Sequence, residues 1–92
     1  MIKSFSHKGL EKFYLKGSKA GIQSHHEKRL RLILAQLNQS EIIEDMNIPT
    51  LNLYALKGNR KGVWSVTVKA NWRITFRFKN GDVEIVNYED YH

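Results

Sequence analysis

The clearest pattern in the chain is a strict alternation of apolar and polar residues between positions 72 and 79. The alternating sets are apolar Trp72, Ile74, Phe76 and Phe78, and polar Arg73, Thr75, Arg77 and Lys79. A period of two residues is typical of a half-buried strand. Asn80-Gly81 follows and predicts a type I′ hairpin turn, because both central residues of that turn need positive φ. A further strand is therefore expected at residues 83–88.

Shorter segments with the same character predict the other strands of the sheet. Residues 2–5 alternate briefly, residues 51–56 read as a second strand, and residues 63–69 alternate well. In the last of these, Trp64, Val66 and Val68 are expected to face the core while Ser65 and Thr67 face outward. Ala70-Asn71 then forms a tight connection. Residues 83–88 are apolar on both faces, which places that strand inside the sheet.

Two segments have the spacing of helices. In the first, residues 9–16 carry apolar side chains at helical intervals, and Gly17 stands where a C-cap glycine belongs. Before the second, Ser24 and Glu27 match a capping box that opens a helix running to about Asn38. Its apolar stripe is Leu30, Ile33, Leu34 and Leu37. Residues 40–48 are compatible with a helical turn or a loop, and Pro49 limits their extent.

The element order is therefore β-α-α-β-β-β-β, which predicts an α+β fold with two N-terminal helices packed on a mainly antiparallel sheet. Residues 1–92 are expected to form one domain. The chain has no cysteine, which excludes disulfides, thiolate nucleophiles and cysteine-based zinc sites. No stretch resembles a signal peptide or a membrane span, so a soluble cytoplasmic protein with no membrane partner is expected.

Charge is distributed unevenly around the net value of +6. Residues 51–81, called the basic stretch below, contain seven lysines and arginines and no acidic residue. Such a surface suits a polyanionic partner. A solvated basic face on a basic protein is the equally simple alternative.

Several weak motifs carry no chemistry. The glycines at positions 58 and 62 lack the Gly-Lys-Ser/Thr of a nucleotide-triphosphate loop. His25 and His26 are adjacent, so on a helix they point about a hundred degrees apart and cannot jointly bind a metal. Together with His7 they are interpreted as surface histidines. No cofactor or metal is expected.

The remaining candidates are Lys57, Arg73, Tyr91 and His92, with Tyr54, Asn71 and Asp90 near them in the sequence. Each alone has an ordinary explanation. Lys57 could solubilise a loop, and Arg73 could pair with Glu84 or Asp90 across the sheet. Tyr91 and His92 could be a frayed tail.

Together these residue types supply what metal-free RNA cleavage needs. The ribose 2′-hydroxyl attacks the adjacent phosphate, so a group must take its proton, cations must stabilise the phosphorane, and a donor must protonate the departing 5′-oxygen. Lysine and arginine suit the phosphorane, and histidine suits proton transfer. Tyrosine can stack on an unpaired base. The lack of acidic ligands argues against a magnesium mechanism.

The stretch L-Y-A-L-K-G-N-R-K-G-V-W-S-V-T-V-K-A-N-W-R-I-T-F-R-F and the ending N-Y-E-D-Y-H closely resemble the HigB toxins of the RelE superfamily. The opening M-I-K-S-F-S-H-K-G-L is also similar, so the resemblance covers the whole chain. It implies a RelE-like fold and a type II toxin, encoded beside a neutralising HigA-like antitoxin. It also implies a ribosome-dependent endonuclease that cuts mRNA in the decoding site without metal, leaving a 2′,3′-cyclic phosphate and a 5′-hydroxyl.

By this resemblance, Lys57 and Arg73 are phosphate-handling cations, and Tyr91 and His92 are the terminal aromatic and the catalytic histidine. Asn71 lines the RNA site, with Asp90 beside it. The family often has histidine where this chain has Tyr54. Tyrosine, with a pKa of about 10, is a poor base, so Tyr54 is assigned to hydrogen bonding or stacking.

Two other functions are compatible with the same features. ParE-type toxins share this fold and inhibit DNA gyrase without catalysis, and fold alone does not determine function. A simple nucleic-acid-binding module would explain the charge alone. The free toxin is expected to be a monomer, and the toxin with its antitoxin a hetero-oligomer.

Overall fold

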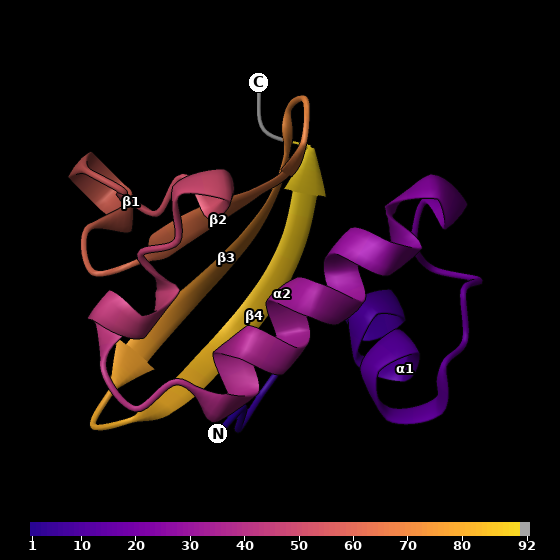
Figure 1. Cartoon of the computed structure of the whole chain (residues 1–92), viewed down its shortest axis with the longest axis horizontal. Coiled ribbons are helices and arrows are strands. Elements are labelled where there is room, and N and C mark those ends of the chain that lie inside the picture. The colour runs from indigo at the N-terminus through magenta and orange to yellow at the C-terminus, as the bar shows by residue number, and fades with distance from the viewer. Residues whose placement is uncertain (91–92) are drawn as a thin grey trace.

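Four strands form one antiparallel sheet in the order β1-β2-β3-β4, with α2 lying across one face and α1 beside it (Figure 1). This arrangement comes from a computed structural model, which describes residues 1–90. The helices and strands are α1 Lys8–Lys16, α2 Glu27–Gln39, β1 Tyr54–Ala55, β2 Trp64–Lys69, β3 Trp72–Lys79 and β4 Asp82–Asp90. The predicted α+β fold with two N-terminal helices is confirmed.

The outer edge of β4 is covered by the N-terminal segment. Ile2 and Phe5 form isolated parallel bridges to Val83 and Val86, and the Lys3 N–H donates to the Val83 carbonyl at 2.7 Å. The predicted first strand is thus present as two bridges rather than a regular ladder. β4 is the last of the four named strands, with β3 on one side. On its other side it has the two N-terminal bridges, so the expectation that the last strand has neighbours on both sides is met.

The predicted hairpin between β3 and β4 is confirmed, with φ of 50° at Asn80 and 83° at Gly81. Beyond it, β4 departs from simple alternation. Thr75 pairs with Asn87 but Arg77 pairs with Glu84, so β4 carries one extra residue and forms a bulge. Ile85 lies in this bulge with a φ of 54° and is half exposed.

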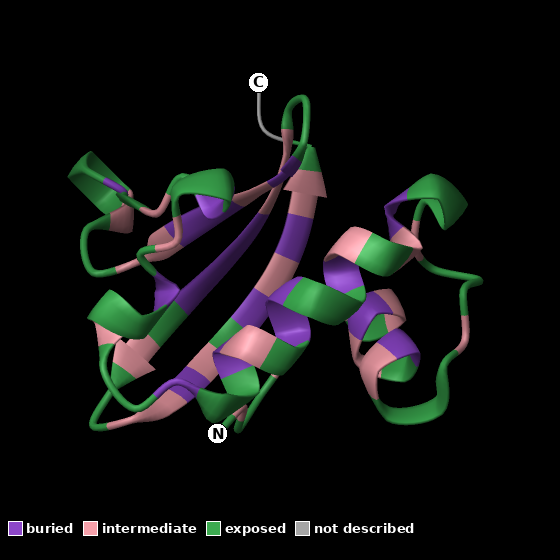
Figure 2. Cartoon of the chain, viewed as in Figure 1, coloured by how far each residue is buried: buried purple, intermediate pink, exposed green. Residues whose placement is uncertain are grey.

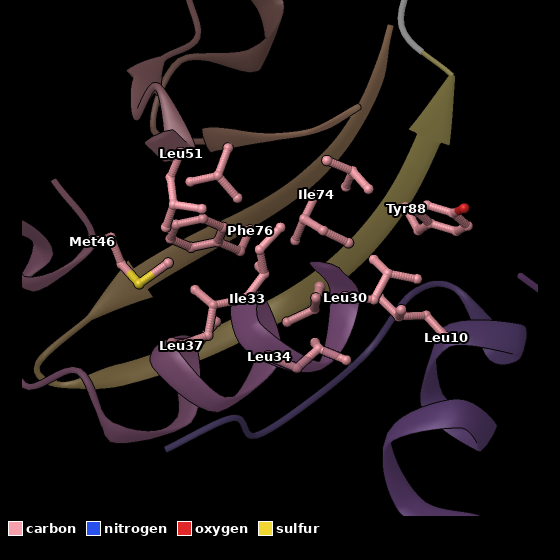
Figure 3. Packing of buried hydrophobic residues seen from close by; sticks show 14 of the residues in the cluster. Leu10, Leu30, Ile33, Leu34, Leu37, Met46, Leu51, Ile74, Phe76 and Tyr88 are labelled. Atoms are coloured by element: carbon pink, nitrogen blue, oxygen red, sulfur yellow. The ribbon is translucent and has the colours of Figure 1, made fainter. Parts of the chain in front are cut away.

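The core lies between α2 and the sheet, and the buried positions of both elements face each other in Figure 2. The predicted apolar stripe of α2 is fully buried, and Figure 3 shows these side chains against Ile74, Phe76 and Tyr88. Leu10 of α1, Met46 and Leu51 close the ends of this cluster. The bulge in β4 lets Val83, Val86 and Tyr88 all enter the core.

Three local predictions outside the first helix were wrong. Ser24 does not cap α2, because residues Ser24–His26 form a 3-10 turn and α2 starts at Glu27. The strand expected at residues 51–56 is reduced to β1, because Pro49–Leu51 form another 3-10 turn. His26 is only 2% exposed and is therefore not a surface histidine.

The first helix ends as the sequence indicates and starts in an unexpected way. Gly17 adopts a φ of 74° and its N–H donates to the Phe13 carbonyl, as a C-cap glycine does. At the other end, the Leu10 N–H donates to Nδ1 of His7 at 2.9 Å. His7 is thus a helix cap and half-buried, rather than a surface residue. Neither α1 nor any other helix within residues 1–90 has the length and apolar character needed to cross a membrane.

Candidate active site

The face of the sheet opposite α2 carries two of the candidate residues, Tyr54 and Arg73, in two rows of cross-strand neighbours. In one row, Tyr54 of β1 is opposite Ser65, Ser65 is opposite Thr75, and Thr75 is opposite Asn87. In the other row, Thr67 is opposite Arg73, and Arg73 is opposite Glu89. Because alternate strand residues share a face, the buried core residues between them point the other way. We call this surface the outer face.

A hollow of about 180 Å³ opens on the outer face above these rows. Ser65 and Thr75 are buried, while Tyr54 is half exposed. The hollow therefore combines side-chain hydroxyls with one guanidinium, a set of hydrogen-bond donors suited to phosphate or ribose. Its lining residues are Asn52, Tyr54, Leu56, Ser65, Thr67, Arg73 and Thr75.

Arg73 is held firmly at the edge of this hollow. It is half-buried on β3, and its Nη1 donates to the carbonyls of Ala70 at 2.5 Å and Trp72 at 3.1 Å. Ala70 adopts a φ of 52° in the connection between β2 and β3, which turns the chain at this point. The remaining guanidinium N–H groups leave a fixed cation for an anion in the hollow.

Lys57 lies in a second hollow of about 350 Å³ that shares Leu56 with the first. The loop that carries it is closed by the Leu56 N–H, which donates to the Val63 carbonyl at 2.9 Å. A 3-10 turn over Gly58–Arg60 follows. The second hollow is also lined by Lys61 and Trp64. Lys57 and Arg73 are therefore in adjoining hollows and not in one pocket.

Asn71 and Asp90 lie at one end of the sheet, close to Arg73. Both are exposed; Asn71 belongs to the connection between β2 and β3, and Asp90 is opposite Trp72 on β3. Tyr91 and His92 fall outside the described residues, so their assignments stay predictions. The structure brings Tyr54 and Arg73 to one hollow, with Lys57 in the hollow next to it and Asn71 and Asp90 at the end of the sheet.

Sequence reasoning did not single out the polar network beside Arg73. Arg60 Nη1 donates to Oε1 of Glu89 at 2.7 Å, and Asn87 Nδ2 donates to Oε2 of Glu89 at 3.1 Å. The alternation already put Ser65 and Thr75 on the face of Arg73, and that signal could have identified them as lining residues. Nothing in the sequence links Arg60 to Glu89, which is 29 positions away.

Among residues 1–90, no group of three or more histidine, aspartate or glutamate side chains is placed to hold a metal ion. The outer face presents hydroxyls and a guanidinium around the first hollow, and Lys57 lines the second. These groups can bind a phosphodiester and stabilise negative charge that develops on it. Proton transfer would require a titratable group beyond these.

Several solved structures have the same fold. The chain is similar to the YoeB dimer of Staphylococcus aureus, with a TM-score of 0.63 and 13% identity over 99% of this chain and 94% of that one. It is similar to a YoeB/ParE toxin of Agrobacterium tumefaciens, with a TM-score of 0.62 and 15% identity over 99% and 96%. YafQ of E. coli has a TM-score of 0.58 and 12% identity over 98% and 91%. At such identities the likeness establishes the fold alone.

Sequence similarity establishes the family. The chain is 48% identical over 92 residues to Endoribonuclease HigB of Proteus vulgaris, and the alignment covers 100% of both chains. Residues 3–92 match the family described as the RelE-like toxin of the type II toxin-antitoxin system HigB. The chain therefore belongs to the HigB-like family of RelE-like toxins of type II toxin–antitoxin systems.

Proposed function

We propose that this toxin is a metal-independent endoribonuclease that cleaves mRNA in the A site of the ribosome and so stops translation. The endoribonuclease class follows from the relative named Endoribonuclease HigB, which is similar over the full length of the chain. The observation that supports it best is the half-buried Arg73, fixed by two backbone carbonyls at the edge of a hydroxyl-lined hollow.

In the proposed reaction, the ribose 2′-hydroxyl attacks the adjacent phosphorus and the bond to the 5′-oxygen breaks. The products are a 2′,3′-cyclic phosphate and a 5′-hydroxyl. Arg73 stabilises the charge on the equatorial phosphorane oxygens, since guanidinium can donate to two oxygens at once. Lys57, in the adjoining hollow, holds the same phosphate or its neighbour.

Proton transfer is assigned to His92, since imidazole titrates near neutral pH. Tyr91 and His92 directly follow Asp90 in the sequence, and Asp90 lies at the end of the sheet where Arg73 is held. Tyr91 orients the phosphate, while Tyr54, Asn71 and Asp90 contact the bound RNA.

The ribosome is proposed as a partner because the basic stretch carries seven lysines and arginines and no acidic residue, which favours ribosomal RNA. Toxin–antitoxin membership implies a neutralising antitoxin, and we propose a HigA-like one that forms a hetero-oligomer with the toxin. The site of action would be the cytoplasm, where translation takes place.

The direct test is to map RNA ends in a purified translation system, with and without ribosomes. Cleavage at codons in the A site, with cyclic-phosphate ends and only when ribosomes are present, is the expected result. Cleavage that is equally fast on free mRNA would exclude ribosome dependence. Arrest of DNA replication before translation, without any cleaved mRNA, would instead indicate a gyrase inhibitor.

Deleting His92 alone should abolish mRNA cleavage and growth arrest while leaving the fold intact, because the described core lies within residues 1–90. Cleavage rate and urea unfolding of the truncated toxin are the two measurements. A truncated toxin that still cuts mRNA at the full rate would show that His92 has no part in proton transfer.

A further inference from the structure

An acidic residue stands directly opposite the proposed phosphate-binding arginine. Arg73 on β3 and Glu89 on β4 are cross-strand partners, and both side chains project from the outer face. Facing residues on antiparallel strands are about 5 Å apart at Cα, close enough for a guanidinium and a carboxylate to pair. Such a pair would cancel the charge that Arg73 offers to RNA.

The structure instead shows the Glu89 carboxylate occupied by two other donors. Nη1 of Arg60 donates to Oε1 at 2.7 Å, and Nδ2 of Asn87 donates to Oε2 at 3.1 Å. Arg73 meanwhile directs its Nη1 to the carbonyls of Ala70 and Trp72. Arg60 therefore binds the Glu89 carboxylate, while Arg73 binds backbone carbonyls.

Arg60 reaches Glu89 of β4 from the loop between β1 and β2. It belongs to the 3-10 turn between β1 and β2, where its N–H donates to the Lys57 carbonyl at 3.4 Å. The side chains of Arg60 and Glu89 are 40% and 25% exposed, so their ion pair is only partly screened by water. A charge-assisted bond of 2.7 Å in that setting is stronger than a typical surface pair.

We propose that Arg60 is a positioning residue, which engages Glu89 so that the guanidinium of Arg73 stays uncompensated and available to the scissile phosphate. This inference rests on the proposed endoribonuclease function and deepens it. Arg60 has no contact with the reacting atoms in this account. Its effect is electrostatic and passes through the carboxylate that faces Arg73.

Two simpler roles for Arg60 make different predictions. In the first, Arg60 does no more than attach the loop of Lys57 to β4. Removing either Arg60 or Glu89 would then destabilise the loop. Arg60 could also bind an RNA phosphate itself. In neither case would the charge of Glu89 become harmful once Arg60 is removed. A rescue experiment therefore separates the three roles.

The experiment compares Arg60→Met, Glu89→Gln and the double variant with the wild type. Met keeps much of the apolar side chain of Arg60, and Gln keeps the shape of Glu89 without its charge. Arg31→Met is the matched control, since it breaks an exposed ion pair of 2.8 Å with Glu27 on α2. The single-turnover rate of mRNA cleavage on programmed ribosomes and the urea-unfolding midpoint are measured for each protein.

Arg60→Met should slow cleavage at least about tenfold, approaching the 10²–10³-fold loss typical of removing an oxyanion donor. Adding Glu89→Gln should restore the rate to within about threefold of the wild type, because the carboxylate that would capture Arg73 is gone. Arg31→Met should cleave at the wild-type rate. A conservative Arg60→Lys variant should keep most of the activity, because it retains the partner of Glu89.

A double variant as slow as Arg60→Met would overturn the proposal, in favour of a loop fastener if the unfolding midpoint drops, or of direct RNA contact if it does not. An Arg60→Met toxin with the wild-type rate would overturn it as well. If the proposed endoribonuclease function itself is wrong, the result is distinguishable, since even the wild type would then produce no cyclic-phosphate ends. Loss of cleavage in Arg73→Ala establishes that the assay reports the proposed site.

Discussion

At the scale of single residues, the outer face depends on how one arginine is held. Arg73 is the only cation in the hollow of Tyr54 and Thr75 among the residues that the structure describes there. Its two bonds to backbone carbonyls restrict the side chain before any RNA arrives. Such preorganisation is what makes a charge effective in a transition state, because no reorganisation is needed during the reaction.

Replacing Arg73 with Ala should lower the single-turnover cleavage rate roughly 10²–10³-fold, nearly as much as deleting His92, because the phosphorane loses its main cation. Arg73→Lys should lower the rate by about tenfold or more, since an ammonium cannot reproduce the planar two-point contact. Arg31→Ala on α2 is the control and should leave the rate unchanged. Equal rates for Arg73→Ala and wild type would remove Arg73 from the mechanism.

At the scale of elements, the bulge in β4 determines which side chains reach the core. The pairing shifts by one residue between Arg77 and Thr75, and Val83, Val86 and Tyr88 are all buried as a result. The bulge also brings Asn87 and Glu89 to the outer face, where they meet Arg60. The bulge also holds the β-branched residue Ile85 at a positive φ, a backbone conformation that is strained for isoleucine.

Ile85→Asn should therefore raise the free energy of unfolding by about 1 kcal/mol, because asparagine tolerates the left-handed region and little packing is lost. Ile85 is 50% exposed. Ile42→Asn is the matched control, since Ile42 is 56% exposed but has an ordinary φ of −130°. Urea unfolding measures the stability of both variants. If Ile85→Asn gains no unfolding free energy relative to Ile42→Asn, Ile85 is not strained.

At the scale of the whole molecule, one buried polar contact ties the helical layer to the sheet. His26 Nδ1 lies 2.6 Å from the Tyr88 hydroxyl, which also accepts the Gln23 N–H at 3.3 Å. The ring of Trp72 lies 4.6 Å from that of Tyr88, between centroids. Burial, followed by the charges of His25 and Lys69, lowers the pKa of His26, and burial raises the pKa of Tyr88. A neutral His26 whose Nδ1 accepts a hydrogen bond from the Tyr88 hydroxyl fits both directions.

Acid should consequently weaken the fold through His26. Its folded-state pKa lies below its ordinary value of 6.5, so below that pH the unfolded chain binds a proton that the folded chain does not. The unfolding free energy should be constant above that value and fall as the pH drops below it, by no more than about 1.4 kcal/mol per pH unit. Urea unfolding from pH 7.5 to 5.0 measures this slope.

His26→Gln should flatten this pH dependence, although it lowers stability overall because the contact with Tyr88 changes. His25→Gln is the control and should retain most of the slope, since His25 is exposed. A slope that is equal in wild type and His26→Gln would show that other groups govern the acid response.

Local patterns were enough to predict most of the fold. The alternation in β3, the Asn80-Gly81 turn, the Gly17 cap and the apolar stripe of α2 are all short-range signals, and the structure confirms each of them. At the start of α2, where prediction failed, a contact distant in the sequence prevailed. Ser24 is a plausible cap by itself, but Tyr88 holds His26 and Gln23 in a different turn.

For the candidate site, the residue types and the face of Arg73 were readable from the sequence, because alternation alone puts Arg73 and Thr75 on one side of a strand. The resemblance to HigB toxins added Lys57, Tyr91 and His92. Tertiary structure alone decided that Lys57 and Arg73 occupy adjoining hollows and that Glu89 binds Arg60. Those relations depend on strand register, on the bulge in β4 and on the position of the loop between β1 and β2, which no local pattern encodes.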